Sequence, residues 1–598
     1  MENKKQAIIL SGVAIVALLA LIIGATYAYF RASGNSGSNT DINVTTYTLD
    51  LLSFEMGSDI KINADQTSFA SGKGNATGST FAKAILTANN KTNTATKNYY
   101  MYLNISNNTF TYTQNENTPE LLLTITDVSG NAITSITGLT YKTVIDGKGT
   151  SVSGFDITTK SGLLTLFDNR EITASPTKTE EWNVTVTFVN YNVNQTGNAG
   201  KSFNAKLMIQ QEEYELTLAD ICAGKTLSDC VISQYTGTQG DNALYYHNST
   251  LTNGAGDNSY RYAGGDYVLT EAGKATGATM MIGYNNSVTT ALIDFYCNGT
   301  KQYVGYASSC STSHYYLIKG DTTQYQTYNE ALNASVEKGY LTKDNVKNFV
   351  CFGSDATTCP TENLYRIIGV FNNHVKLIKY DYAKSSLLGT DGDFSQEYTS
   401  NYFSGEQGES PSSNSLYYWN NAGTNTWSAS KLNTVNLNTN FTTNIGTAWA
   451  NKIATTTWKV GGGTYANLRD AVPKTAYQYE VGSSASTTTY DAKIGLMYVS
   501  DYYYSASPSA WTLVGYNSDY TKSYASAKGE NWLYGGGWDW TISRNSDSSN
   551  FAFDVSYSGN VNYHSVYDGN GVRPSFSLLS STTYVSGSGS MSDPVRIN

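Results

Sequence analysis

The chain has 598 residues, of which 40% are hydrophobic and 14% are charged, and its formal net charge is −10. This balance is too apolar for a disordered chain and too polar for a membrane protein with many spans. Beyond an N-terminal pair of lysines there is no cluster of Lys and Arg, so the basic surface that nucleic-acid binding requires is missing. The length predicts two or three domains, at roughly 100 to 200 residues each.

An uncharged apolar segment runs from Ala7 to Phe30, directly after the basic start of the chain. This is the charge pattern of an export signal. A removable signal has an apolar core of roughly 7 to 15 residues, whereas roughly 20 apolar residues span a bilayer, and this segment fits both. We therefore expect residues 1–30 to be a signal peptide, cut near Ala28 and Tyr29, or a transmembrane signal anchor. In both cases the rest of the chain is expected to be extracellular.

Residues 31–40 are rich in Ser, Gly and Asn and are expected to be a spacer. From residue 41 to 211, several segments alternate apolar and polar residues between Asn/Gly turn signals, which predicts strands with one buried face. Because no helical segment of comparable length intervenes, residues 41–211 are predicted to form one antiparallel β-sandwich. The predicted buried faces are Tyr99, Met101, Leu103 and Ile105; Trp182, Val184, Val186 and Phe188; and Phe203, Ala205, Leu207 and Ile209.

Four segments of the first 211 residues form a recognisable pattern: the apolar run that ends in TYAYF, the strand NVTTYTLDL, and the later segments EEWNVTVTFVNYN and GKSFNAKLMIQ. With this pattern the first 211 residues resemble the TasA/camelysin family of exported Gram-positive proteins. It implies a jelly-roll-like sandwich, a signal removed by a signal peptidase, and a place on the cell surface or in biofilm fibres. The camelysin name also implies proteolysis, but the sequence has no H-E-x-x-H motif for a catalytic zinc.

Residues 212–360 carry all the cysteines and are predicted to be an irregular connector. An exported chain meets oxidising conditions, so these cysteines are expected to form disulfides. Six cysteines permit 15 connectivities, and sequential pairing is the simplest. Zinc is disfavoured because the spacings exceed those of thiolate sites. The candidate pairs are Cys222 with Cys230, Cys297 with Cys310, and Cys351 with Cys359.

Short helical pieces are expected within the connector at TLADICAG and LSDCVISQY. A capping box formed by Thr327 and Glu330 predicts a further helix that ends at Gly339. The stretch 265–345 carries no motif that predicts a role.

Residues 361–598 differ in composition, since eight of the nine tryptophans lie from Trp419 onward. The segment YRIIGVFNNHVKLIK predicts a β-hairpin that turns at Asn372 and Asn373. One or two helices fit the apolar spacing of 428–453, and the strand IGLMYVSD follows.

This order resembles the exported domains of gut Gram-positive bacteria that are related to formylglycine-generating enzymes and C-type lectins, which implies a C-type-lectin-like α+β domain. GGGWDWTIS departs from the R-S-P of those relatives, and the long stretch between SYRYAG and NFVCFGSD is an insertion relative to them. The matching segments are Tyr365 to Gly369, Trp427 to Leu432, Ile494 to Asp501, Trp532 to Arg544, and Gly571 to Leu578.

No catalytic residue, metal or cofactor is predicted for this domain. Formylglycine generation works through a thiolate-bound metal, and no cysteine follows Cys359. Calcium binding of the lectin type needs an oxygen-rich loop, which Trp419-Asn420-Asn421 resembles only faintly.

Aromatic residues around Gly535 to Gly537 are the best candidates for a binding site, because flat rings stack on sugars and anchor protein partners. Packing in the core is the competing interpretation of the same rings. The candidate ligand-binding residues are Trp532, Tyr534, Trp538, Asp539, Trp540, Arg544 and Tyr563.

The sequence therefore predicts a non-catalytic exported protein of the cell surface or extracellular matrix. Its C-terminal domain is expected to bind a glycan or a host or bacterial surface protein, and residues 7–30 would hold it in the membrane if they are not removed. Two alternatives stay open. One is a biofilm-type fibre subunit that self-assembles through its sandwich. The other is a glycan-cleaving enzyme that uses Glu530 and Asp539 as its two carboxylates.

Overall fold

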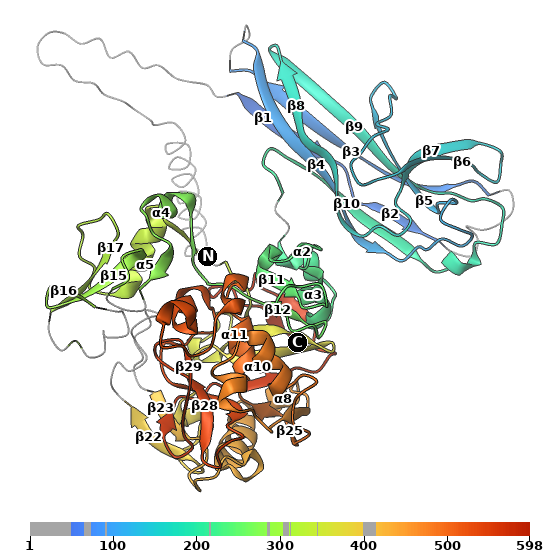
Figure 1. Ribbon diagram of the computed structural model, residues 1–598. Coiled ribbons are helices and arrows are strands. Elements are labelled where there is room, and N and C mark those ends of the chain that lie inside the picture. Colours follow the sequence, from blue (N-terminus) through green and yellow to red (C-terminus); the bar gives the residue numbers. More distant parts are fainter. Residues whose placement is uncertain are drawn as a thin grey trace, which may run out of the picture. The chain divides into compact units, whose positions relative to one another are not determined.

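The computed structural model describes residues 50–64, 73–89, 93–214, 217–283, 287–302, 310, 313–343, 345–398 and 414–598. The chain divides into two compact units, Met1–Glu213 and Tyr214–Asn598, which are coloured blue to teal and green to red in Figure 1. The expected signal or anchor segment, its cut site and the spacer lie outside the described residues. Within the described part of the chain, no helix has the length and apolar character needed to cross a membrane.

The first unit consists of two antiparallel sheets that share one core. One sheet has the order β1-β3-β9-β5-β7-β6 and the other β2-β10-β4-β8. The strands are β1 (Leu51–Met56), β2 (Ile60–Asn63), β3 (Ala76–Thr87), β4 (Ala95–Asn108), β5 (Leu121–Asp127), β6 (Tyr141–Ile145), β7 (Ser151–Asp156), β8 (Gly162–Ala174), β9 (Thr177–Phe188) and β10 (Ser202–Gln210), and a 3-10 turn spans Thr196–Asn198. The prediction of an antiparallel β-sandwich in this part of the chain is confirmed.

All three predicted apolar faces, on β4, β9 and β10, are buried in the core between the sheets. A small polar network adjoins them at one place, in which Tyr99 and Trp182 are buried while Glu180 and Arg170 are partly exposed. Tyr99 donates a hydrogen bond of 2.7 Å to Glu180 and accepts one of 2.9 Å from the indole of Trp182. Arg170 binds the same carboxylate through its Nε atom at 2.9 Å. The buried hydroxyl of Tyr99 and the buried indole N–H of Trp182 thus have partners, which removes most of the penalty for taking them out of water.

The second unit is built around a seven-stranded sheet with the order β11-β12-β20-β21-β31-β26, to which β19 adds beside β20. Its strands are β11 (Leu244–Tyr246), β12 (Tyr260–Tyr262), β19 (Phe349–Cys351), β20 (Leu364–Phe371), β21 (His374–Lys379), β26 (Ile494–Gly495) and β31 (Ser575–Ser577). Strands from both sides of the predicted boundary at 360 pair in this one sheet. A connector separate from the C-terminal domain is therefore not what the structure shows.

The pairing of β12 with β20 explains this difference. Gly369 of β20 lies opposite Arg261, and a Cβ atom at Gly369 would come within 2.2 Å of the carbonyl oxygen of Tyr260. Only a residue without a side chain lets the two strands approach this closely. Apolar residues of the predicted connector, such as Leu227 and Val350, belong to the same core as the C-terminal tryptophans.

The hairpin between β20 and β21 turns at Asn372 and Asn373, as predicted. Both residues are left-handed, with φ angles of 48° and 63°. This is the conformation of a two-residue type I′ turn, which asparagine tolerates well. The helical segment expected at 428–453 is also present, but its main part, Leu432–Phe441, is a π-helix (η7).

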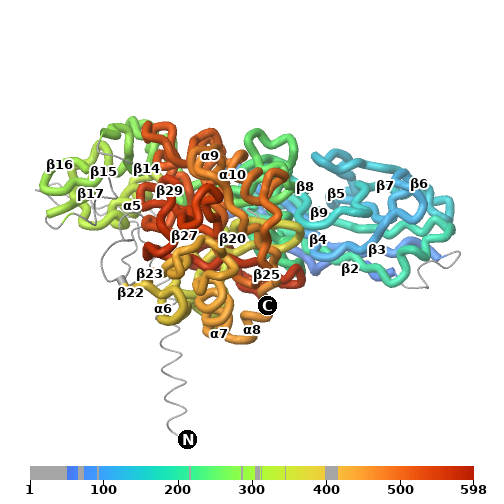
Figure 2. The backbone as a smooth tube through the Cα atoms, turned by 60° about the horizontal axis from the view of Figure 1, so that its bottom comes forward, coloured from blue at the N-terminus to red at the C-terminus, as the bar shows by residue number. Residues whose placement is uncertain are grey.

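The other elements of the second unit are short; among them, α6, α7 and α8 lie close together at one side of the unit (Figure 2). The helices are α2 (Leu218–Cys222), α3 (Leu227–Ser233), α4 (Glu271–Ala275), α5 (Tyr328–Glu337), α6 (Ser385–Leu388), α7 (Thr442–Asn444), α8 (Thr447–Ala450), α9 (Tyr465–Leu468), α10 (Pro473–Glu480) and α11 (Val499–Tyr504). The remaining strands are β13 (Val268–Leu269), β14 (Met280–Ile282), β15 (Ala291–Cys297), β16 (Thr300–Gln302), β17 (His314–Ile318), β18 (Leu341–Thr342), β22 (Phe394–Tyr398), β23 (Asn414–Tyr418), β24 (Thr456–Lys459), β25 (Thr489–Ala492), β27 (Asp539–Arg544), β28 (Phe551–Val555), β29 (Val561–Ser565), β30 (Gly569–Asn570), β32 (Tyr584–Ser586) and β33 (Arg596–Ile597).

The stretch 265–345, for which the sequence predicts no role, forms a small α/β lobe. Strands β14 to β17 and helix α5 enclose a separate core that includes Leu292, Phe295 and Leu332. The predicted capping box is present: Thr327 and Glu330 exchange hydrogen bonds at the start of α5. The helix ends at Glu337, shortly before Gly339, whose φ angle is 72°.

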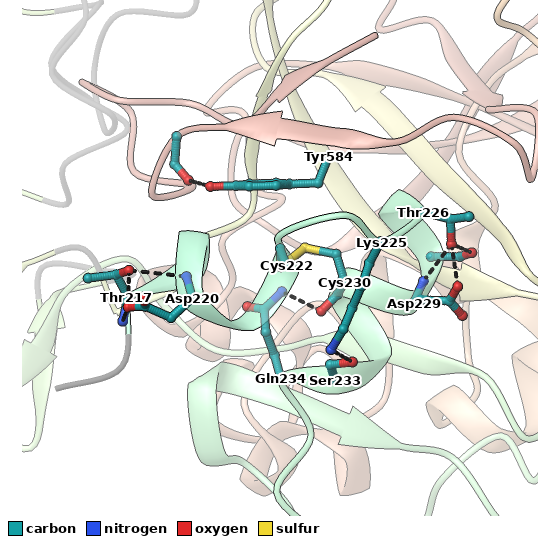
Figure 3. The surroundings of a disulfide bond; sticks show 12 residues. Thr217, Asp220, Cys222, Lys225, Thr226, Asp229, Cys230, Ser233, Gln234 and Tyr584 are labelled. Carbon is teal, nitrogen blue, oxygen red and sulfur yellow. Dashed lines mark hydrogen bonds between the residues drawn. A yellow bond between two sulfur atoms is a disulfide. The ribbon is translucent and has the colours of Figure 1, made fainter. Parts of the chain in front are cut away.

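Three disulfides join Cys222 to Cys230, Cys297 to Cys310, and Cys351 to Cys359, which is the sequential pairing that the sequence favours. Figure 3 shows the first of them. It connects the end of α2 to α3, two short helices whose N-termini are capped by Thr217 and Thr226. Both sulfurs are buried in the main core, so this disulfide fixes the helix pair against the sheet.

Candidate functional site

Three of the aromatic residues that the sequence offers as ligand contacts, Trp532, Tyr534 and Trp540, are buried in the core. The indole N–H of Trp532 donates to the carbonyl oxygen of Tyr262 at 2.9 Å, and that of Trp540 to the carbonyl oxygen of Tyr417 at 2.8 Å. These rings hold elements of the unit together. Core packing, the competing interpretation, is therefore their role.

Asp539 is also a core residue. Its Oδ2 atom accepts a hydrogen bond of 2.6 Å from Nε of Arg573, and burial raises the pKa of this carboxyl to about 6. Glu530, the expected partner in glycan cleavage, is exposed. One carboxylate is thus committed to a buried ion pair while the other faces solvent. This arrangement does not support the alternative of a two-carboxylate enzyme built on these residues.

The other three candidates lie in separate surroundings. Trp538 is half-buried, and its ring centre lies 4.3 Å from that of His564. Tyr563 packs on Tyr465, with 4.4 Å between ring centres. Arg544 donates a hydrogen bond of 3.0 Å to a backbone carbonyl oxygen. The structure does not gather the predicted residues into one site.

His564 and Asp554 form a pair that the sequence does not reveal. Nδ1 of His564 lies 2.5 Å from Oδ2 of Asp554, which also accepts a hydrogen bond of 2.9 Å from Asn570. Burial works against the charged imidazole, but the carboxylate outweighs it and raises the pKa of His564. Burial also raises the pKa of Asp554. The pair is a charged group within the sheet β27-β28-β29.

A cavity of about 280 Å³ opens elsewhere in the second unit, between the β20–β21 hairpin, β12, β24, α10 and α11. None of the predicted candidates lines it. The lining residues are Asp257, Ser259, Arg261, Phe371, Asn372, Lys376, Thr456, Thr457, Trp458, Lys459, Tyr477, Val481, Tyr498, Ser500, Asp501 and Ser577. We refer to this cavity as the Lys376 pocket.

Charged side chains form the buried part of the Lys376 pocket. Arg261, Lys376 and Asp501 are 2%, 7% and 3% exposed, respectively. Nζ of Lys376 donates to Oδ2 of Asp501 at 2.5 Å. Nη2 of Arg261 donates to Asp257 at 2.6 Å, and its Nε atom to the hydroxyl of Ser259 at 2.8 Å. Buried charges of this kind persist only when they are paired, as these are.

Aromatic rings enclose the two cations. The guanidinium carbon of Arg261 lies 4.7 Å from the ring centre of Phe371 and 5.4 Å from that of Tyr477. Nζ of Lys376 lies 4.6 Å from the ring centre of Tyr498 and 5.2 Å from that of Trp458. Distances below about 6 Å give favourable cation–π contacts. The rings therefore stabilise both cations while presenting apolar surface to the cavity.

The contacts with Arg261 and Ser259 keep Asp257 ionised at neutral pH. Burial alone would raise the pKa of Asp257, but the charge of Arg261 and the hydrogen bonds from Ser259 and Arg261 lower this pKa to about 2. His247 is buried near Arg261 but does not line the pocket. Burial and the charge of Arg261 hold the pKa of His247 well below its usual value, which keeps that imidazole neutral. The lining therefore carries three formal positive charges, on Arg261, Lys376 and Lys459, against two carboxylates.

The chain was compared with known proteins. No family model matches it, and no relative was found among curated proteins.

Proposed function

We propose that the chain is an exported, non-catalytic protein of a Gram-positive bacterium that acts at the cell surface or in the extracellular matrix, and that its second unit binds a ligand in the Lys376 pocket. The pocket carries this proposal, because a concave site with apolar walls and a few buried polar groups is the usual form of a ligand site. Arg261, Lys376 and Asp501 provide those polar groups, and Trp458 and Tyr498 the walls.

Export is supported by two independent features. The first is the apolar segment Ala7 to Phe30 behind a basic start. The second is the set of three disulfides, since such bonds form and persist in oxidising compartments. Within this proposal the first unit is a TasA-like jelly roll and the second a C-type-lectin-like domain. The first unit attaches the protein to the matrix if residues 1–30 are removed, and the apolar segment attaches it to the membrane if they are kept.

The size of the pocket limits what it can hold. Sites for small molecules typically measure about 300 to 1,000 Å³. At about 280 Å³ the Lys376 pocket lies just below this range. The ligand is therefore a small group, such as one terminal residue of a glycan or one side chain of a surface protein.

A blocking variant tests the proposal. Thr457 lies exposed at the rim of the pocket, and Thr455, two residues earlier, is equally exposed but does not line it. We expect Thr457→Trp to fill the mouth of the pocket and to abolish the signals that the whole mature chain gives on an array of glycans and surface proteins. Thr455→Trp adds the same ring outside the pocket and should leave those signals unchanged. The proposal would be refuted if both variants bound the array equally well. It would also be refuted if the unmodified chain bound no glycan or protein on the array.

Assembly into a fibre is a second candidate for the first unit, and the edge strands favour it. Among the described strands, β1 and β6 form the edges of the larger sheet. Leu51 on β1 is 63% exposed and Ile145 on β6 is 60% exposed. Exposed apolar edge strands can pair with a strand of another copy. Electron microscopy of the purified mature protein should then show filaments, whereas a persistent monomer at high concentration removes this candidate.

A further inference from the structure

We infer that the Lys376 pocket selects a sugar that carries a carboxylate, such as a terminal uronic or sialic acid. The inference rests on the proposed function and names the class of ligand. It follows from three properties of the lining: N–H groups that donate to no acceptor among the described residues, an excess of positive charge, and aromatic walls.

These N–H groups belong to the two buried cations. A lysine ammonium has three N–H groups, and Lys376 donates one of them to Asp501. Arg261 donates through Nε and Nη2, while its Nη1 atom lies 4.0 Å from Oδ1 of Asp501, beyond hydrogen-bond distance. The two cations approach the same carboxylate from its two oxygens, so they lie close to each other. One anionic group on the floor of the pocket can contact both of them.

The charge of the lining favours a single negative charge in the ligand. Three cations face two carboxylates in this pocket, although the chain as a whole has a formal net charge of −10. Glu480 does not line the pocket, and its carboxylate already has hydrogen-bond partners: its oxygens accept the backbone N–H groups of Val499 and Ser500 at 2.8 Å. A ligand carboxylate neutralises the excess and forms charge-assisted hydrogen bonds, which are about twice as strong as neutral ones.

The walls suit the rest of a sugar. Phe371, Trp458, Tyr477 and Tyr498 present rings on which the apolar face of a pyranose can lie. The lining also includes five residues with hydroxyl groups: Ser259, Ser500, Ser577, Thr456 and Thr457. A carboxylate without a ring would leave the aromatic surface uncovered, and a neutral sugar would not balance the one excess positive charge of the lining. The volume admits one ring, so we expect the acidic sugar to be a terminal residue.

Calorimetric titration of the whole mature chain tests the inference. The ligands are methyl glucuronoside, the methyl glycoside of N-acetylneuraminate, and the methyl ester of each, which has the same ring without the charge. We expect at least one acid to bind, and its ester to bind at least about 10-fold more weakly, because hydrogen bonds to a charged group are lost. Binding of the acid should also weaken with added salt.

Two matched variants locate the effect. Lys459→Glu reverses a half-exposed charge at the rim of the pocket, and Lys452→Glu makes the same change at a half-exposed lysine that packs on Trp449 outside it. The first should weaken binding of the acid several-fold, and the second should leave it unchanged. A blocking Thr457→Trp variant should abolish it.

The possible outcomes separate the inference from the proposal on which it rests. Equal affinity for acid and ester, lost in Thr457→Trp, would overturn the preference for an acid while supporting the pocket as a ligand site. Binding of simple carboxylates such as acetate as strongly as the sugars would overturn the sugar. If neither acid binds while the array yields another ligand that Thr457→Trp abolishes, the inference fails alone. If no ligand of any kind is found, both fail.

Discussion

Lys376 and Asp501 form a buried ion pair, with 2.5 Å between Nζ and Oδ2, although they lie 125 residues apart in the sequence. The same oxygen of Asp501 accepts the backbone N–H of Tyr498 at 2.8 Å and so caps the N-terminus of α11. One carboxylate thus joins β21 of the main sheet to the start of a helix and forms part of the floor of the Lys376 pocket. Stability and ligand binding depend on the same side chain.

The first prediction concerns this carboxylate. We expect Asp501→Asn to lower the free energy of unfolding of the second unit by about 3 to 5 kcal/mol, because the variant leaves the buried charge of Lys376 without its partner. Urea unfolding followed by tryptophan fluorescence measures this change, since eight of the nine tryptophans lie in this unit. The exposed Asp491→Asn is the control and should cost no more than about 0.5 kcal/mol. A loss below about 1 kcal/mol in Asp501→Asn would contradict the account.

The second prediction concerns Asp539 and pH. Because burial raises its pKa to about 6, the folded state keeps a proton that the unfolded state releases near pH 4. The free energy of unfolding should therefore fall as pH rises from about 4 to 6, by up to about 1.4 kcal/mol per pH unit from this group. Asp539→Asn loses the ion pair with Arg573 and is less stable throughout, but its unfolding energy should depend less on pH in this window. Identical slopes in both proteins would argue against a protonated Asp539.

The third prediction concerns His564. Burial lowers the pKa of this imidazole, while the carboxylate of Asp554 and, less strongly, that of Asp568 raise it above the usual value near 6.5. Asp554→Asn removes the stronger of the two raising effects, so the pKa should fall below the usual value. The ring-proton NMR signals of the four histidines, followed against pH, measure this directly. An unchanged titration of His564 in the variant would mean that the carboxylate does not control it.

The fourth prediction tests how the main sheet is assembled. Gly369→Ala places a Cβ atom 2.2 Å from the carbonyl oxygen of Tyr260, so β12 must move away from β20. We expect a loss of about 1 to 3 kcal/mol or more, as for other overpacked sites. Hydrogen exchange of the backbone amides in β12 should also become faster. At Gly529, a Cβ atom meets its nearest neighbours at 3.7 Å, so Gly529→Ala is a control from the same unit. Equal stability of the two variants would show that the sheet tolerates the separation.

Local patterns predicted the local features of this fold. Alternation along β4, β9 and β10 gave the buried faces of the sandwich, because a strand repeats every two residues whatever its partners are. Two asparagines predicted the hairpin turn, and a capping box predicted the start of α5, since the chemistry of both lies within four residues. The cysteines left 15 connectivities open, and the simplest of them, sequential pairing, is the one that the structure shows.

Long-range features were not predictable in this way. The pairing of β12 with β20 joins residues more than 100 positions apart, so the boundary expected at 360 fell inside one sheet. The Lys376 pocket draws residues from 257 to 577, and Arg261, Lys376 and Asp501 each look like an ordinary strand or loop charge in the sequence. The cluster of aromatic residues near residue 540 resembles a binding site in composition, but Trp532 and Trp540 lie in the core. Composition alone does not show whether a ring faces the core or the solvent.

Hydrogen–deuterium exchange of the whole mature chain, with and without its strongest array ligand, shows where the ligand binds. We expect slower exchange in β24, in the turn at Asn372 and Asn373, and at the start of α11, which together surround the Lys376 pocket. Protection confined to the first unit, or to β29 and the residues just before β27, where His564 and Trp538 lie, would place the ligand elsewhere and contradict the proposed site.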